Sequence, residues 1–312
     1  MNRRISETNG PMNGIIVLDK PPDMTSAHVV AQVKRILKAK KVGHTGTLDP
    51  FATGVLVCCI NKATRLARFL TYGKKRYIGT MRLGIRTDTQ DLTGQLVSTE
   101  PELTVTDREV HRVFHGFLEV QHQNPPAYSA LKHHGVPLYR LARRGTFIQK
   151  PPRRIHIYEL QVLEISLPDV RFEVCCSAGT YVRTMCSDIG DALGCGAHLT
   201  GLCRTESGRF SLDEAISLNA LERLAAAGEI SNCIIPMSVA LRGMPCVSAD
   251  HELVQRIQHG HRVTQEEVTA EVEEACPWIK VTDRQGNLIA VMNSTVRNGV
   301  YPYACVFPSR ES

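Results

Sequence analysis

The residues best suited to chemistry stand in one short segment, GHTGTLDPFATG, at positions 43–54. It places a single carboxylate, Asp49, among glycines, threonines and a proline, with His44 five positions earlier. The simplest interpretation is structural, because an Asp–Pro pair is common in turns and at the start of a helix. The alternative is a catalytic carboxylate on a rigid loop, where glycines let a substrate approach the backbone closely.

Two other kinds of site fit the sequence poorly. The G-x-x-x-x-G-K-[ST] pattern of a phosphate-binding loop is absent, and a metal site at His44 and Asp49 lacks a third ligand at matching spacing. The eleven cysteines contain no C-x-x-C pair, and the nearest approach to a zinc cluster is Cys195, His198 and Cys203. Because a second paired set is missing, we expect reduced, structural cysteines and no metal.

Charge is unevenly distributed along the 312 residues, which carry 37 Lys and Arg against 31 Asp and Glu, a net charge of +6. Residues 241–312 hold seven basic and nine acidic residues, so the first 240 carry the whole basic excess. A polyanionic partner would meet that N-terminal part, although a solvated basic face explains the excess equally well. No apolar run reaches the length of about 18 residues that a membrane span requires. The polar N-terminus lacks a signal-peptide core, so we expect a cytoplasmic protein.

The segments around Asp49 predict short strands and one helix. GIIVL at 14–18 predicts a buried strand that ends in a turn at the two prolines after it. Ser26 is expected to cap a helix with apolar residues at helical spacing through Leu37, and the basic run KRILKAKK suits that helix's C-terminus. GVLVCCI at 54–60 predicts the strand that follows Asp49.

Three helices are expected further along the chain. One follows the capping box of Thr106 and Glu109, one begins at the Gly-Thr turn of GTYVRT, and one ends at Gly228. Residues 124–155 are rich in Pro, Gly, Tyr and basic residues, which indicates a long excursion between core elements.

The C-terminal part has a different pattern. Pro236 and Pro245 bracket an expected linker, and WIKVTDRQGNLIAVMNST beyond it predicts a hairpin. Strands and helices are mixed upstream without regular alternation, so α+β is the expected class. We therefore expect a large domain at 1–240 and a small β-rich domain at 241–312.

Residues 43–58, GHTGTLDPFATGVLVC, resemble the signature of the TruB family of tRNA pseudouridine synthases, G-H-x-G-x-L-D-P-x-A-x-G-x-L. Three other segments resemble family motifs and occur in the family's order: GIIVLDKPPDMTS, KRYIGTMRLGIRTDTQDLTG and GTYVRT. In the first of them, Asp23 and Met24 depart from the motif. The resemblance covers residues 13 to about 220, and the C-terminal region more weakly as a PUA-like domain. It implies a mixed, mainly antiparallel central sheet flanked by helices.

The resemblance also implies a role for each site residue. Asp49 would be the catalytic carboxylate, since cleavage of the N1–C1′ bond leaves C1′ electron-poor and a carboxylate can act there as nucleophile or base. Three mechanisms are open: attack on C1′, attack on C6 of the base, or removal of the 2′ proton. Arg183 would pair with it and oppose its protonation. Tyr77 would stack on the base and handle the C5 proton. The residues expected to hold the flipped nucleotide or line its pocket are His44, Tyr181 and Leu202.

The implied substrate is the T loop of tRNA, whose target base must leave its stack to reach Asp49. The excursion at 124–155 resembles the family's RNA-binding insertion, and RNA loops are recognised through shape, stacking and backbone contacts. With the basic helix end it would form a positively charged saddle. The expected RNA-binding residues are Lys38, Lys41, Lys132, Arg143, Arg144, Arg153 and Arg154. The acidic C-terminal domain is expected to make only a peripheral contact.

The resemblance implies a stand-alone monomer that makes pseudouridine at position 55 of tRNA, with no obligatory protein partner. The reaction has no redox step and no phosphate transfer, so neither a metal nor an organic cofactor is required. One rival is a guide-RNA-dependent relative acting on ribosomal RNA, a branch that lacks the long insertion. Another is a tRNA-binding folding chaperone, against which the set of Asp49, Tyr77 and Arg183 argues.

Overall fold

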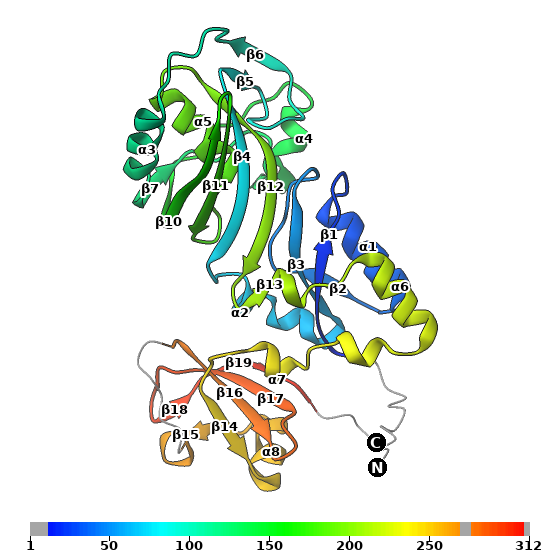
Figure 1. Cartoon of the computed structure of the whole chain (residues 1–312). Helices are drawn as coiled ribbons and strands as arrows, with labels where there is room; N and C mark the ends of the chain where they lie inside the picture. The colour runs from blue at the N-terminus through cyan, green and yellow to red at the C-terminus, as the bar shows by residue number, and fades with distance from the viewer. Residues whose placement is uncertain (1–11, 269–275, 309–312) are drawn as a thin grey trace.

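The computed structural model describes residues 12–268 and 276–308. Residues 1–11 of the first expected domain, and residues 269–275 and 309–312 of the second, lie outside the described residues. A nine-stranded sheet forms the frame of the larger part, and a four-stranded sheet follows near the C-terminus (Figure 1). Among the described helices, none is long and apolar enough to cross a membrane.

The large sheet has the strand order β1-β3-β12-β4-β11-β10-β7, with β2 paired to β3 and β13 to β12. Its pairings are antiparallel except for a short parallel contact between β3 and β12. The expected α+β class with a mainly antiparallel central sheet is therefore confirmed. The strands are β1 (Gly14–Lys20), β2 (Val42–His44), β3 (Thr53–Ile60), β4 (Lys75–Leu83), β7 (Glu119–Gln123), β10 (Arg153–Ser166), β11 (Asp169–Cys176), β12 (Ala197–Ser207) and β13 (Phe210–Ser211).

Two pairs of helices cover different parts of this sheet (Figure 1). Apolar residues of α3 and α5 pack on β4, β10 and β11 around Met81 and Phe172, whereas α1 and α6 pack beside β1 and β3 around Leu18 and Leu56. The helices are α1 (Ser26–Ile36), α2 (Ala67–Leu70), α3 (Asp107–Gly116), α4 (Leu138–Ala142), α5 (Val182–Ala192), α6 (Leu218–Ala227), α7 (Met237–Ala240) and α8 (His251–Gln258), with 3₁₀ turns at Asn61–Leu66, Leu212–Glu214, Ile230–Cys233 and Gln265–Glu267.

Most of the local sequence signals are confirmed. Thr106 and Glu109 form the expected capping box of α3. Gly228 ends α6 in the left-handed conformation with φ 74°, which glycine adopts without a steric cost. The expected hairpin is present as the antiparallel pair of β16 (Trp278–Asp283) and β17 (Leu288–Asn293). The expected cap at Ser26 is wrong, because Thr25 caps α1 by accepting a hydrogen bond from the His28 N–H.

The C-terminal sheet packs directly against the large one. Leu288, Val291 and Phe307 share one apolar cluster with Val17 and Val55 of β1 and β3. The segment between Pro236 and Pro245, where a linker is expected, contains α7, and its Ala240 and Leu241 are buried in the same cluster. The sheet order is β14 (Cys246–Ala249), β16 (Trp278–Asp283), β17 (Leu288–Asn293), β19 (Tyr303–Val306). Two-stranded pairs are β5 (Ile85–Thr87) with β6 (Leu96–Thr99), β8 (Lys132–His133) with β9 (Val136–Pro137), and β15 (Val263–Thr264) with β18 (Val300–Tyr301).

Candidate active site

The loop that carries Asp49 connects β2 to β3 and is held on both sides of the carboxylate. Ser26 Oγ accepts a hydrogen bond from the Leu48 N–H (2.9 Å) and donates one to the Leu48 carbonyl (3.1 Å). Lys20 Nζ donates to the Pro50 carbonyl (2.9 Å), and its other hydrogen bonds go to two carbonyls of the turn between β1 and α1. Burial lowers the pKa of Lys20 to about 8. Both neighbours of Asp49 are thus fixed to the β1–α1 turn.

Arg183, at the start of α5, lies against Asp49. Its Nε is 3.7 Å from Asp49 Oδ2, a distance of an ion pair that is too long for a hydrogen bond. Its Nη1 is 3.3 Å from Asp91 Oδ2, and its Nη2 donates to the Tyr128 carbonyl (2.5 Å). Nε itself is buried, and no residue in the described ranges accepts a hydrogen bond from it. The predicted pairing of Arg183 with Asp49 is present, and Arg183 is oriented chiefly by its other two contacts.

Asp91 is a site residue that the sequence analysis did not assign. It is 2% exposed and accepts hydrogen bonds from Thr89 Oγ1 (2.7 Å), Thr93 Oγ1 (2.6 Å) and the Thr93 N–H (3.0 Å). These contacts fix a carboxylate whose charge faces Arg183. In the sequence, Asp91 stands within KRYIGTMRLGIRTDTQDLTG, a segment that resembles a family motif, but an aspartate among threonines equally indicates an ordinary turn.

The Asp49 carboxylate is available to a ligand. Its side chain is 31% exposed, and no described residue donates a hydrogen bond to it. Burial raises its pKa, Arg183 lowers it, the charge of Asp91 raises it again, and Lys20 lowers it. Asp49 is therefore a partly desolvated carboxylate whose ionised form depends on the arginine beside it.

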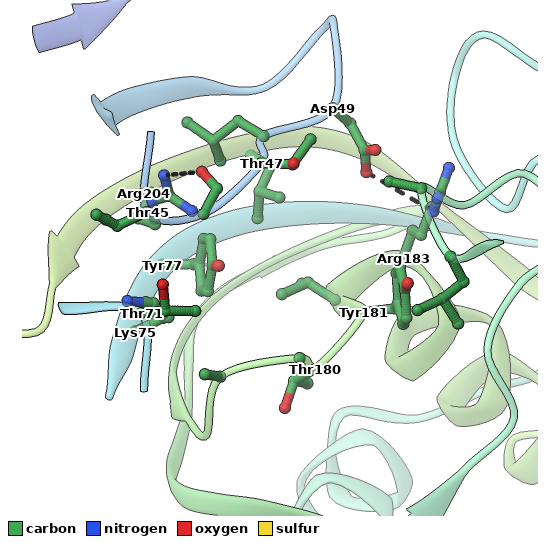
Figure 2. A pocket seen from close by; sticks show the side chains of 18 residues that line it. Thr45, Thr47, Asp49, Thr71, Lys75, Tyr77, Thr180, Tyr181, Arg183 and Arg204 are labelled. Atoms are coloured by element: carbon green, nitrogen blue, oxygen red, sulfur yellow. Dashed lines mark hydrogen bonds and ion pairs between the residues drawn. The ribbon is translucent and has the colours of Figure 1, made fainter. Parts of the chain in front are cut away.

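A cavity of about 420 Å³ opens beside Asp49 (Figure 2). Tyr77 on β4 and Tyr181 before α5 line it with Leu202, and Asp49 and Arg183 close one end. The backbone of Tyr181 is fixed by the buried Gln123, whose side-chain amide donates to the Tyr181 carbonyl (3.0 Å) and accepts from its N–H (2.8 Å). Five of the six predicted pocket residues therefore meet in one cavity.

The sixth, His44, lines a second cavity of about 460 Å³. Asp49 and Arg183 line both cavities, so the two cavities adjoin at these residues. His44 Nδ1 is buried and has no hydrogen-bond partner in the part of the chain that the structure describes. Burial and the charge of Arg204 lower the pKa of His44, so its imidazole is neutral near pH 7.

The expected RNA-binding residues are all exposed, as a contact with a polyanion requires. Arg143 also lines the second cavity, where its guanidinium lies 5.7 Å from the centre of the Tyr139 ring. The exposed set comprises Lys38, Lys41, Lys132, Arg143, Arg144, Arg153 and Arg154.

The residues considered for zinc make ordinary contacts. Cys195 Sγ donates to the adjacent Gly196 carbonyl, and His198 Nδ1 lies 3.1 Å from the Ile85 carbonyl. Within the described ranges, no group of three or more His, Cys, Asp or Glu could hold a metal ion.

The comparisons with known proteins agree with this geometry. The family described as "TruB family pseudouridylate synthase (N terminal domain)" matches residues 34–182, and "tRNA pseudouridylate synthase B C-terminal domain" matches residues 183–242. The tRNA pseudouridine synthase B of Syntrophotalea carbinolica is 46% identical over 249 residues, covering 80% of this chain and 81% of the relative. That of Burkholderia mallei is 40% identical over 285 residues, covering 91% and 94%.

Among solved structures, a chain of a Cbf5-Nop10-Gar1 complex superposes with a TM-score of 0.74 at 28% identity, covering 94% of this chain and 84% of that one. Fold and site together define a pseudouridylate synthase. The chain belongs to the TruB family of these enzymes.

Proposed function

We propose that this enzyme converts uridine to pseudouridine at position 55 in the T loop of tRNA, with Asp49 as the catalytic carboxylate. The observation that carries the proposal is the position of Asp49 beside Arg183, in the wall between two cavities. The relatives named tRNA pseudouridine synthase B, which match most of the chain, support tRNA as the substrate.

The cavity that contains Tyr77 would receive the flipped uridine. Its aromatic and apolar walls at Tyr77, Tyr181 and Leu202 suit the faces of a base, and Asp49 at the end would meet the ribose. The base leaves its stack to enter, as chemistry on a base in a folded RNA requires. Tyr77 would stack on the base and receive the C5 proton.

Asp49 can act only as a carboxylate, whether it attacks C1′, attacks C6 or removes the 2′ proton. Burial favours the neutral acid, and the nearby charge of Arg183 opposes this. Because no described residue donates a hydrogen bond to the Asp49 carboxylate, whose distance to Arg183 Nε is 3.7 Å, its oxygens remain free for the substrate. Arg183 thus keeps the carboxylate ionised without occupying its oxygens.

The second cavity would receive the part of the RNA loop next to the target. Tyr128 and Tyr139 offer aromatic surfaces, and Arg143 offers a charge for a phosphate. A neutral His44, whose Nδ1 has no hydrogen-bond partner among the described residues, would contact the flipped nucleotide. The exposed basic residues of the insertion would bind the surrounding backbone.

Residues 1–240 would form the catalytic domain, with its RNA-binding insertion at about 124–155. Residues 241–312 would form a PUA-like domain with a peripheral contact to tRNA, in keeping with their excess of acidic residues. The enzyme would act as a monomer without a protein partner.

The test is to incubate the purified protein with an unmodified tRNA transcript and to map pseudouridine by carbodiimide-blocked primer extension. We expect product at position 55 from the wild type, none from Asp49→Asn, and wild-type product from Asp19→Asn, a matched change at an exposed position of β1. Equal product from Asp49→Asn would overturn the catalytic assignment. Tight tRNA binding without product from the wild type would favour the chaperone rival.

The structural similarity to a chain of a Cbf5-Nop10-Gar1 complex favours a second candidate, a synthase that needs a guide RNA and partner proteins and acts on ribosomal RNA. Product on tRNA from the protein alone argues against it. An inactive protein that gains activity only when guide RNA and partner proteins are added would establish it.

A further inference from the structure

Arg204 on β12 is a buried cation for which the proposed reaction has no role. It is 2% exposed and is among the largest fully buried side chains of the described residues. No ion pair within the described ranges includes it, although Asp49 lines the same cavity. A desolvated charge without a counter-charge is unfavourable for folding, so its retention calls for an explanation beyond stability.

The guanidinium of Arg204 bridges the two ends of the catalytic loop. Its Nε donates to the Val55 carbonyl (2.7 Å) at the start of β3, and its Nη2 donates to the Gly46 carbonyl (3.0 Å) before Asp49 (Figure 2). The planar fork of an arginine reaches both carbonyls at once, which a lysine cannot do in the same way.

Arg204 also stands beside Tyr77. The two residues are directly opposite partners in the β12–β4 ladder, and both line the cavity with Asp49. Burial raises the pKa of Tyr77 above its ordinary value, and the nearby charge of Arg204 opposes part of this rise. The same side chain therefore holds the backbone on both sides of the carboxylate and lies beside the tyrosine.

The other ionisable groups around the phenol do not replace Arg204. Lys75, two residues earlier on β4, donates to Ser207 Oγ, and burial lowers its pKa to about 8. The Cys176 thiol on β11 is neutral, because burial raises its pKa to about 12. Asp49, on the loop, raises the pKa of Tyr77. Arg204 is thus the principal permanent positive charge that favours the phenolate.

We propose that Arg204 is a positioning residue of the reaction, which fixes the Asp49 loop through Gly46 and Val55 and, with its charge beside Tyr77, favours the phenolate that accepts the C5 proton. This rests on the proposed function, in which Tyr77 receives that proton. Arg204 touches neither the ribose nor the base in this proposal, and acts through the two residues that do.

The proton balance of the step is simple. When C5 bonds to C1′, C5 carries both its hydrogen and the new bond, and the ring holds an N1=C6 double bond. The Tyr77 phenolate takes the C5 proton, the electrons of the C5–H bond form C5=C6, and those of N1=C6 move to N1. N1 then takes a proton from water and Tyr77 returns its proton to water, so the net change is a proton moved from C5 to N1.

The test measures single-turnover product formation on a tRNA transcript that carries either ordinary or C5-deuterated uridine. The variants are Arg204→Gln, Arg204→Lys, Tyr77→Phe and the double variant Arg204→Gln/Tyr77→Phe. Arg82→Gln is the matched control, because Arg82 lies on β4 but pairs with Asp169 away from the cavity. Circular dichroism and melting temperature report whether each variant folds, and filter binding reports its affinity for tRNA.

For Arg204→Gln we expect product formation to slow by roughly ten- to a hundredfold, with tRNA affinity unchanged. The deuterium isotope effect should rise above that of the wild type, because C5–H removal becomes limiting. The pH–rate profile should move to higher pH, since Tyr77 loses the charge that lowers its pKa. Arg204→Lys should recover part of the rate. Arg204→Gln should slow the Tyr77→Phe variant less than it slows the wild type, because only its support of the Asp49 loop is then lost.

Three results would overturn the proposal: a folded Arg204→Gln with the wild-type rate, a slower variant with an unchanged isotope effect and pH profile, or equal effects with and without Tyr77. If Arg204→Gln does not fold, Arg204→Lys decides by the same criteria. If the wild type makes no pseudouridine in tRNA, the proposed function fails, and the Arg204 variants are then compared on the RNA that the wild type does modify.

Discussion

In the proposed reaction the Asp49 carboxyl is charged, yet it lies where a charge is unfavourable. Burial and Asp91 raise its pKa against the opposing charges of Arg183 and Lys20. Because the pKa of this carboxyl is higher in the folded than in the unfolded chain, its ionisation lowers the free energy of unfolding. That loss is absent below the unfolded-chain pKa and complete above the folded-state pKa. An ionised Asp49 at neutral pH, which the proposed reaction needs, therefore lowers the free energy of unfolding.

We therefore expect Asp49→Asn to abolish product formation and to melt at a higher temperature than the wild type at pH 7. The difference in melting temperature should shrink as the pH falls through the raised pKa of Asp49, because the wild-type carboxyl then becomes neutral. Calorimetry between pH 4 and pH 7.5 measures this difference. A variant that is less stable than the wild type at pH 7 would contradict the assigned electrostatics.

Asp91 differs from Asp49, because its carboxylate accepts hydrogen bonds from Thr89 and Thr93 and lies against the Arg183 charge. Asp91→Asn would place amide protons against the Thr93 N–H and leave Arg183 with a weakened partner. We expect a loss of about 3 kcal/mol in the free energy of unfolding and slower product formation, measured by urea titration and single turnover. Asp88→Asn, an exposed change in the same turn, is the control and should lose well under half of that amount.

At the scale of elements, the catalytic loop depends on the turn between β1 and α1. Thr25 caps α1, which leaves the Ser26 hydroxyl free to hold both backbone groups of Leu48. A helix terminus thereby becomes a support for the loop, and Lys20 supports the other side at Pro50. The rigidity of the Asp49 loop is therefore a property of two elements packed together.

Ser26→Ala should leave the Leu48 N–H and carbonyl buried without partners. We expect a loss of about 2 kcal/mol in the free energy of unfolding and a several-fold lower rate with unchanged tRNA affinity. Ser217→Ala is the control: it removes the cap of α6, far along the chain from the loop, and should cost about 1 kcal/mol without an effect on rate. Equal rates for the two variants would argue against the support role of Ser26.

At the scale of the whole molecule, the two sheets share one apolar cluster. In it, residues of β1 and β3 pack with residues of β17 and with Phe307, which follows β19. Phe69 and Trp278 meet edge to face with ring centres 5.1 Å apart, and the Arg68 guanidinium lies 4.7 Å and 5.9 Å from the two rings. Because each sheet leaves apolar surface that the other covers, we expect the two parts to unfold together.

Trp278 is the single tryptophan of the chain, so its fluorescence reports on this contact. We expect its urea transition to coincide with that of far-ultraviolet circular dichroism. Phe69→Ala should move both transitions together, by about 2 kcal/mol, because it removes a partly buried ring from the contact. A fluorescence transition that precedes the loss of secondary structure would show that the C-terminal sheet unfolds separately.

The sequence alone determined the elements whose signals are local. The capping box of Thr106 and Glu109, the left-handed Gly228 and the strand after Asp49 depend on neighbours a few residues away. The family motif added the pairing of Asp49 with Arg183, which residue types alone leave undecided. Such signals are short-ranged because capping and periodicity act within one or two turns of chain.

The tertiary structure decided the contacts that join distant segments. Asp91 reaches Arg183 across 92 positions, and Arg204 reaches Gly46 across 158. In the sequence these were a turn aspartate and a strand arginine, and His44 gave no sign that it would face a second cavity. Strand register and burial create these relations, because β12 sets Arg204 opposite Tyr77 and excludes water from its charge. Desolvation and long-range pairing exist only once the sheet has formed.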